Sequence, residues 1–153
     1  MAYDVPDNLL RLGQDVSPDR LRYHNKRILV TKEFTFDAAH HLYSYEGKCK
    51  NLHGHTYRLQ VSASAPVNEI GMAVDFGDLK QVVTSAVVDR LDHQYLNKVL
   101  PPMNTTAENM VVWIFEEIWA ALKKRDEQAT VERVVLWETP TSSVEVSREA
   151  MGW

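Results

Sequence analysis

The chain carries the sequence CKNLHGH from Cys49 to His55, and this segment separates two stretches in which apolar and polar residues alternate. The stretch before it has apolar residues on one parity, at Ile28, Val30, Phe34, Phe36 and Ala38. The stretch after it does the same, at Tyr57, Leu59, Val61 and Ala63. Strict alternation is typical of a strand with one buried face. The sequence therefore predicts an antiparallel hairpin whose loop carries a cysteine and leads into two histidines.

Three histidines around this loop are candidate metal ligands. Imidazole is the commonest protein ligand of zinc, and catalytic zinc usually has three protein ligands. His53 and His55 are two residues apart, so in an extended segment they share a face, and Gly54 between them leaves room for an ion. If the returning strand begins at Thr56, we expect His40 to lie opposite His55. The alternative, which the spacing leaves open, is that these are surface or capping histidines.

The cysteine in the loop is the only one in the chain, so it cannot form an intramolecular disulfide. Lys48 and Lys50 flank Cys49, and nearby positive charge favours the reactive thiolate. A lone cysteine is more often an inert small hydrophobic residue, but such cysteines usually have apolar neighbours. We therefore interpret Cys49 as a candidate reactive thiol.

Composition limits the classes of protein to consider. The 153 residues, 44% of them hydrophobic, suffice for one domain with a sizeable core. A net charge of -4 argues against nucleic acid as the main partner. We find no signal-peptide pattern and no apolar run that could span a membrane, so we expect no membrane partner and a cytoplasmic location. Residues 1–26 are polar and predict an N-terminal extension, followed by a single domain over residues 27–153.

Two helices are predicted after the hairpin. Apolar residues have helical spacing from Phe76 to Leu91, and either Asp75 or Asp78 could cap the start of this helix. A capping box that begins at Thr105 predicts a second helix, which we expect to end near Arg125.

Two further strands are predicted at the C-terminal end, over Val131–Glu138 and Ser143–Ser147, joined by a turn that contains Pro140. The order strand, strand, helix, helix, strand, strand predicts an α+β fold, with an antiparallel sheet and both helices on one face. The other sheet face then needs cover, and oligomerisation is one way to provide it.

Three further groups could take part in chemistry. Asp92 and His93 are adjacent in the run LDHQYLN and could form a proton relay, unless Asp92 only caps the helix end and His93 is merely exposed. Together with Cys49 they make a plausible acid/base set. Glu138 ends an apolar strand, where it is either solvated or points into a pocket and accepts paired hydrogen bonds from a ligand.

The motifs FTFDAAH, CKNLHGH, LDHQYLN and NTTAE, with the strand end at Glu138, resemble the 6-pyruvoyl-tetrahydropterin synthase and 6-carboxytetrahydropterin synthase family. The resemblance runs from about Lys32 to Thr139, and the chain is most similar to the bacterial carboxy-tetrahydropterin synthases of queuosine biosynthesis. It implies the tunnelling fold, in which subunits join their sheets into an oligomeric barrel, commonly a homo-hexamer of two trimers. The extension before Arg27 has no counterpart that we can place.

The resemblance also implies a lyase that converts 7,8-dihydroneopterin triphosphate into 6-carboxytetrahydropterin, acetaldehyde and triphosphate. Active sites of this family form at subunit interfaces. Carried over by motif, the implied groups are zinc ligands, catalytic residues and pterin-binding residues: His40, His53 and His55; Cys49, Asp92 and His93; and Glu138 and Thr106, respectively.

One spacing bears on the choice between close relatives. Three residues separate Cys49 from His53, as in the carboxy synthases, whereas the animal 6-pyruvoyl synthases have five. A further branch, which cleaves dihydroneopterin, has a glutamate in place of the cysteine. Two alternatives stay open: a 6-pyruvoyl-tetrahydropterin synthase, and a non-catalytic protein that binds zinc or a pterin.

Overall fold

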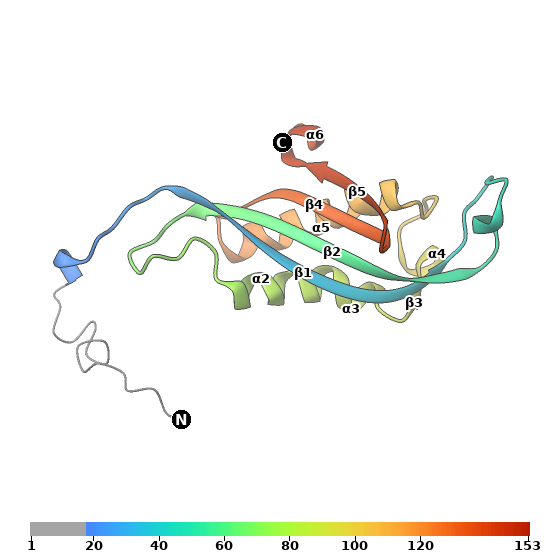
Figure 1. The fold of residues 1–153 in the computed structure, drawn as a ribbon, viewed down its shortest axis with the longest axis horizontal. Helices are drawn as coiled ribbons and strands as arrows, with labels where there is room; N and C mark the ends of the chain where they lie inside the picture. Colours follow the sequence, from blue (N-terminus) through green and yellow to red (C-terminus); the bar gives the residue numbers. More distant parts are fainter. Residues whose placement is uncertain (1–17) are drawn as a thin grey trace, which may run out of the picture.

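The hairpin predicted from the alternating sequence forms the long spine of the fold (Figure 1). The computed structural model describes residues 18–153; most of the predicted extension, residues 1–17, lies outside the described residues. Strands β1 (Arg27–His40) and β2 (His53–Pro66) pair antiparallel along their whole length. Their buried side chains alternate as predicted, because successive residues of a strand point to opposite faces.

The register of this hairpin differs from the expected one by two residues. His40 pairs with His53, and His55 pairs with Ala38, so our expectation that His40 lies opposite His55 is wrong. Pairing resumes at His53 rather than at Thr56, after a loop that contains a short 3-10 turn, η2 (Lys48–Lys50). Because the side-chain period of a strand is two, this shift leaves all three histidines on the same face.

The complete sheet has five strands in the order β3-β1-β2-β4-β5. Strands β4 (Thr130–Thr139) and β5 (Ser142–Ser147) occupy the predicted positions and pair antiparallel. The expectation of a purely antiparallel sheet is wrong at one edge, where β3 (Gln94–Tyr95) pairs parallel to β1. A strand of two residues has no measurable alternation, so the sequence pattern could not reveal it.

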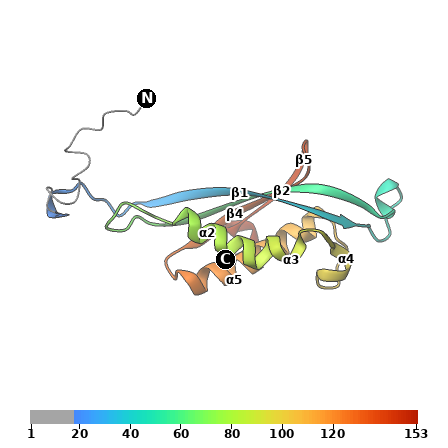
Figure 2. The ribbon, with the colours of Figure 1, turned by 90° about the horizontal axis from the view of Figure 1, so that it is seen from below.

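All the longer helices lie on one face of the sheet, as predicted (Figure 2). The first is continuous through α2 (Phe76–Val83), a π-helical turn η3 (Thr84–Val88) and α3 (Asp89–Leu91). Of the two candidate caps, Asp75 is the N-cap, and its side chain accepts a hydrogen bond from the Asp78 backbone N–H. The described residues also form short helices at Pro18–Arg20 (η1), Leu96–Val99 (α4) and Arg148–Met151 (α6).

The second long helix, α5 (Ala107–Arg125), ends where we predicted but begins one residue later. Its N-cap is Thr106, whose hydroxyl accepts from the Asn109 backbone N–H, and not Thr105. Thr105 is fully buried, and its carbonyl is bonded to a histidine ring. No helix within residues 18–153 is long and apolar enough to cross a membrane.

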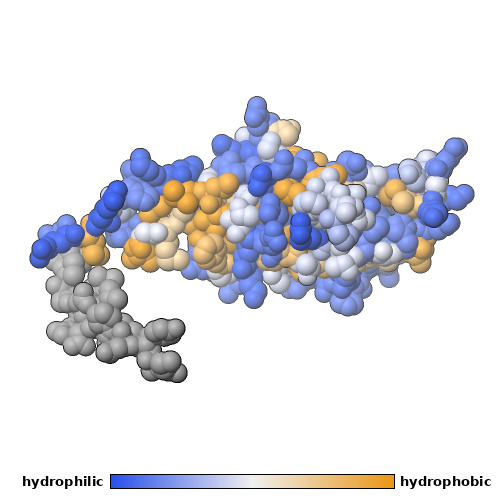
Figure 3. Space-filling view, in the orientation of Figure 1, coloured by the Kyte–Doolittle hydropathy of each residue, from blue (hydrophilic) through white to orange (hydrophobic). Residues whose placement is uncertain are grey.

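The core fills the space between the helices and one sheet face, and the other sheet face is polar. The largest fully buried side chains come from both layers and include Phe36, Tyr57, Leu59, Leu79, Met110, Ile114 and Leu136. On the opposite face, polar side chains bond to one another, as between Thr31 and Ser62 and between Gln60 and Glu33. Exposed apolar surface gathers at the end of the molecule where β1 begins (Figure 3).

Candidate metal centre and active site

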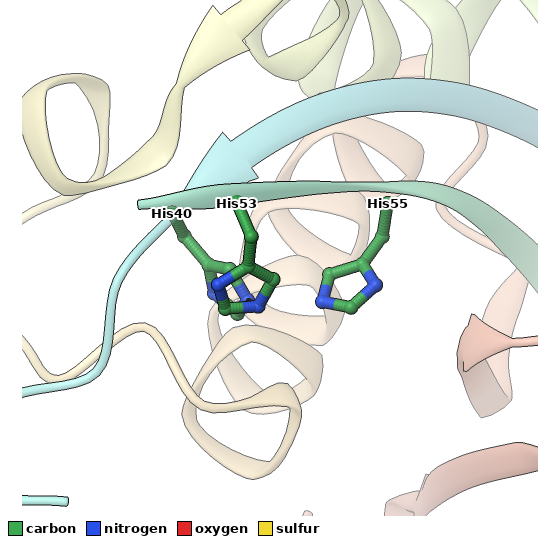
Figure 4. Close-up of side chains that lie close together, drawn as sticks. All are labelled: His40, His53 and His55. Carbon is green, nitrogen blue, oxygen red and sulfur yellow. Dashed lines mark hydrogen bonds between the residues drawn. The ribbon is translucent and has the colours of Figure 1, made fainter. Parts of the chain in front are cut away.

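The three candidate ligands meet at the loop end of the hairpin. His40 is the last residue of β1, and His53 and His55 are the first and third residues of β2. They continue the helix-facing row that includes Phe36 and Tyr57, whose rings stack on each other. One ring nitrogen from each histidine lies within 4.8 Å of the others, and the rings extend from the same side of the strands (Figure 4).

Two of the rings are held so that Nε2 is the free nitrogen. The Nδ1 of His40 donates to the Thr105 carbonyl at 2.9 Å, and the Nδ1 of His53 donates to the Asn51 carbonyl at 2.7 Å. Their Nε2 atoms, which then carry lone pairs, lie 3.1 Å apart. Two lone pairs at that distance repel unless a proton or a cation lies between them. Tetrahedral zinc, with Zn–N bonds near 2.1 Å, holds two such nitrogens about 3.4 Å apart, so the pair is close to the spacing that a metal ion needs.

The third ring adds a nitrogen that the surrounding protein leaves unpaired. The Nε2 of His55 is buried and has no hydrogen-bond partner among the described residues; the nearest carboxylate oxygen, from Glu138, is 3.7 Å away. Burial lowers the pKa of both His40 and His55 from the usual 6.5, and this outweighs the opposite effect of Glu138. The fold therefore favours neutral imidazoles, which is the form that binds metals.

Glu138 connects this cluster to a cavity. It lies near the end of β4, with carboxylate oxygens 3.7 Å from the Nε2 of His55 and 4.0 Å from the Nε2 of His40. Its side chain is 27% exposed. Glu138, Cys49 and Thr106 line one open cavity of about 400 Å³. Of the two alternatives for Glu138, the structure therefore has the carboxylate facing a pocket.

Cys49 lies in the middle of η2, and its side chain is partly buried. Its carbonyl accepts a hydrogen bond of 2.9 Å from the Leu42 backbone N–H, which closes the loop. Cys49 borders the same cavity as Glu138.

Asp92 and His93 form the expected side-chain pair, but at the edge of the sheet. Asp92 accepts from the Asp37 backbone N–H at 2.9 Å and lies 3.0 Å from the His93 Nδ1. The Asp37 N–H is the main reason why the pKa of Asp92 is lowered, and His93 adds to it. The His93 side chain is 79% exposed and borders a different cavity, together with Tyr95 and the candidate ligand His55. A single chain therefore gives His93 and Cys49 separate cavities.

Sequence reasoning missed three residues that hold the histidine end of β1: Asn97, Thr105 and Asn104. The asparagines lie within LDHQYLN and NTTAE, motifs that carry the resemblance. Their contacts reach more than fifty residues along the chain, so no local pattern reveals them. The only sequence signal was the presence of an asparagine without an assigned role in each motif.

Comparison with known proteins identifies the family of this chain. The family model described as 6-pyruvoyl tetrahydropterin synthase matches residues 29–149. The chain is 38% identical to a 6-carboxy-5,6,7,8-tetrahydropterin synthase of Haemophilus influenzae over 140 residues, which cover 76% of this chain and 96% of that protein. It is also 38% identical to a dihydroneopterin monophosphate aldolase of Pyrococcus furiosus over 112 residues, covering 73% of this chain and 90% of that one.

The structural comparison gives the same result. The 6-pyruvoyl tetrahydropterin synthase of Caenorhabditis elegans superposes with a TM-score of 0.72 at 26% identity, covering 82% of this chain and 99% of that one. The tunnelling fold that the resemblance implied is thereby confirmed for the single chain. On sequence and structure together, this chain belongs to the 6-pyruvoyl tetrahydropterin synthase family of enzymes.

Proposed function

We propose that this protein is a zinc-dependent 6-carboxytetrahydropterin synthase that acts on 7,8-dihydroneopterin triphosphate in queuosine biosynthesis. The observation that carries the proposal is the convergence of three histidines near Glu138, which borders a cavity together with Cys49. In this reaction the pterin ring is reduced while its side chain is oxidised, so no external oxidant or reductant is needed. Triphosphate leaves, and water cleaves the remaining side chain to release acetaldehyde and a ring carboxylate.

The metal would be held by His40, His53 and His55, each through its Nε2. For His40 and His53, the hydrogen bonds from Nδ1 to backbone carbonyls support this assignment, because such bonds fix the tautomer and the direction of a ligating imidazole. For His55, the support is its buried Nε2, which has no hydrogen-bond partner among the described residues. Bound there, zinc would supply Lewis-acid polarisation of the hydroxyl groups of the substrate side chain.

Recognition of the pterin falls to Glu138 and Thr106. A carboxylate can accept two parallel hydrogen bonds from the N–H groups on the guanidine-like edge of a pterin. The Thr106 hydroxyl already accepts from Asn109, which leaves its own hydrogen available for the ligand. Both residues border the cavity of Cys49, so a ring bound by them would have its side chain near the thiol.

Proton transfer is assigned to Cys49 and His93. As thiolate, Cys49 removes a proton from a side-chain carbon, and His93 exchanges the second proton. Asp92 holds the His93 Nδ1 and leaves its exposed Nε2 for the transfer. Because Cys49 and His93 border different cavities of one chain, we propose that His93 serves a neighbouring subunit in a homo-oligomer, which the family resemblance suggests is a hexamer.

Percentage identity alone does not decide between the activities of the relatives, since a carboxy synthase and an aldolase are both 38% identical to this chain, over 140 and 112 residues respectively. The presence of Cys49 argues against the aldolase branch, and its three-residue spacing from His53 favours the carboxy synthase. The 6-pyruvoyl synthase stays the second candidate, supported by the match to the nematode enzyme.

Cys49→Ala tests the proposal. This variant should lose turnover of 7,8-dihydroneopterin triphosphate, while the zinc content measured by elemental analysis stays at the wild-type level. His40→Ala is the matched control, which should lose zinc as well as turnover. Retained turnover in folded Cys49→Ala would refute the assigned role of the thiol, and a zinc-binding wild type without turnover would favour a non-catalytic binding protein.

A further inference from the structure

Two asparagine side chains hold the chain just beyond the last residue of β1. The Asn97 Oδ1 accepts from the His41 N–H at 3.0 Å, and its Nδ2 donates to the His41 carbonyl at 3.0 Å. Asn104 makes the same pair of bonds with Tyr43, at 2.9 and 3.1 Å. Each amide therefore replaces the N–H and C=O that a neighbouring strand would offer. The strand-like pairing of β1 continues for three residues through side chains.

The opposite edge of this short segment holds the cysteine loop. Residues 41 and 43 bond to the asparagines, and the intervening Leu42 N–H points the other way and donates to the Cys49 carbonyl at 2.9 Å. The segment 41–43 is thus fixed between two side-chain amides and the turn that carries the thiol. A shift of the segment would move Cys49 relative to the cavity.

Asn97 is also connected to the candidate metal ligand by a second route. The hydroxyl of Thr105 lies 3.3 Å from the Asn97 Oδ1, and the Thr105 carbonyl receives the Nδ1 hydrogen of His40. Thr105 and His40 are both almost completely buried. The direction in which His40 presents its Nε2 therefore depends on Asn97 through Thr105 and through the adjoining His41 backbone.

We propose that Asn97 and Asn104 are positioning residues of the site: Asn97 fixes His40 toward the metal, and Asn104 fixes the Cys49 turn against the cavity. The proposal rests on the metal and thiol roles given above. Hydrogen bonds that hold a ligand in its binding orientation remove the need to order it when the metal binds, which raises affinity. A merely structural role predicts a loss of stability alone.

The first test measures zinc affinity by competition with a chromophoric chelator. Asn97→Ala should bind Zn²⁺ about 10- to 100-fold more weakly than the wild type, the range typical for removing the support of a metal ligand. Asn68→Ala is the matched control, because the Asn68 Oδ1 also accepts from two backbone N–H groups, those of Ile70 and Met72, in another loop. It should lose stability without losing zinc affinity.

The second test uses the single cysteine, whose alkylation by iodoacetamide reports on one site only. In metal-free protein, Asn104→Ala should be alkylated about tenfold faster than the wild type, because losing two hydrogen bonds loosens the segment that holds the turn. Asn68→Ala should react at the wild-type rate. A rate for Asn104→Ala within twofold of the wild type would overturn the role of Asn104.

The outcomes separate the two proposals. If wild-type protein does not bind zinc, the proposed function fails, and the alkylation rates still test Asn104. If the wild type binds zinc and folded Asn97→Ala binds it equally well, the positioning role of Asn97 fails while the function stands. Should Asn97→Ala not fold, Asn97→Ser keeps one possible bond and should show a smaller loss of zinc affinity; no loss would again overturn the proposal.

Discussion

Burial decides the protonation state of the candidate metal ligands. Removing His40 and His55 from water disfavours their charged forms and lowers each pKa from 6.5, while the Glu138 carboxylate opposes this and His53 adds to it. Because burial is the largest of these effects, His40 and His55 stay neutral at a pH where an exposed histidine would begin to take up a proton. A proton therefore competes poorly with a metal ion at these two rings.

This leads to a prediction about pH. Proton competition at His40 and His55 should weaken zinc binding only below about pH 6.5, because the pKa of each of these two rings is lowered from 6.5. The free energy of unfolding of the metal-free protein should also decrease as the pH falls below about 6.5. A depressed folded-state pKa contributes stability that is present above 6.5 and lost as the pH falls through the folded value.

Chelator competition and denaturant unfolding of metal-free protein, each over a series of pH values, check this prediction. His55→Gln should flatten the pH dependence of unfolding, because it removes one of the two buried titrating rings. Zinc affinity that already falls steeply from pH 8 to pH 7 would show that the folded protein raises these pKa values instead.

At the level of the elements, the first helix owes its start to a single side chain. The Asp75 carboxylate accepts the Asp78 N–H at 3.0 Å and also carries negative charge at the helix N-terminus. Asp75→Ala should lower the free energy of unfolding by about 1 kcal/mol. Asp75→Ser should lower it much less, because a serine hydroxyl can also cap the helix. Urea unfolding measures both values. Zinc affinity should be the same in all three proteins, and a change would contradict the separation of this cap from the site.

The long elements were predictable because their patterns are local. Alternation over β1 and β2 and helical spacing over α5 repeat many times, so a single exception does not hide them. The start of α5 was less predictable, since Thr105 and Thr106 both satisfy the preference for an N-cap. Only the bond from Thr105 to His40, sixty-five residues apart, decides between them.

The sequence predicted which side chains could take part in chemistry at the candidate site. It did not predict the strand register or the hydrogen bonds that hold those side chains in place. The histidines, the cysteine and Glu138 stand out by residue type and spacing. The exact register, with His40 facing His53, depends on how the intervening loop closes through the bond from Leu42 to Cys49. The two asparagine clamps depend on tertiary contacts, which no local period reports.

Within a single chain, the Asp92–His93 pair does not share a cavity with the Cys49 thiol. The His93 side chain is 79% exposed at the sheet edge, and its cavity is separate from the one that Cys49 borders. The sheet face opposite the helices is largely polar, with Arg133 bridging to Glu145 and Arg58 lying over Trp137, so a second copy covering it would meet mostly hydrogen-bonding groups. Both features fit a site that is completed by assembly.

A subunit-mixing experiment tests this completion. Cys49→Ala and His93→Ala should each be inactive alone. If they are dissociated in mild denaturant, mixed in equal amounts and reassembled, about a quarter of the sites should contain both intact groups, because each group then comes from a different chain. Turnover that recovers to about that fraction supports shared sites. No recovery, with mixed oligomers shown to form by native mass spectrometry, would mean that both groups act within one chain.

The most direct test of the account is to identify the products by mass spectrometry after zinc-loaded protein is incubated with 7,8-dihydroneopterin triphosphate. We predict 6-carboxytetrahydropterin together with acetaldehyde and triphosphate. Accumulation of 6-pyruvoyl-tetrahydropterin would contradict it and assign the chain to the other synthase activity of its family, and an unchanged substrate would contradict the enzymatic assignment itself.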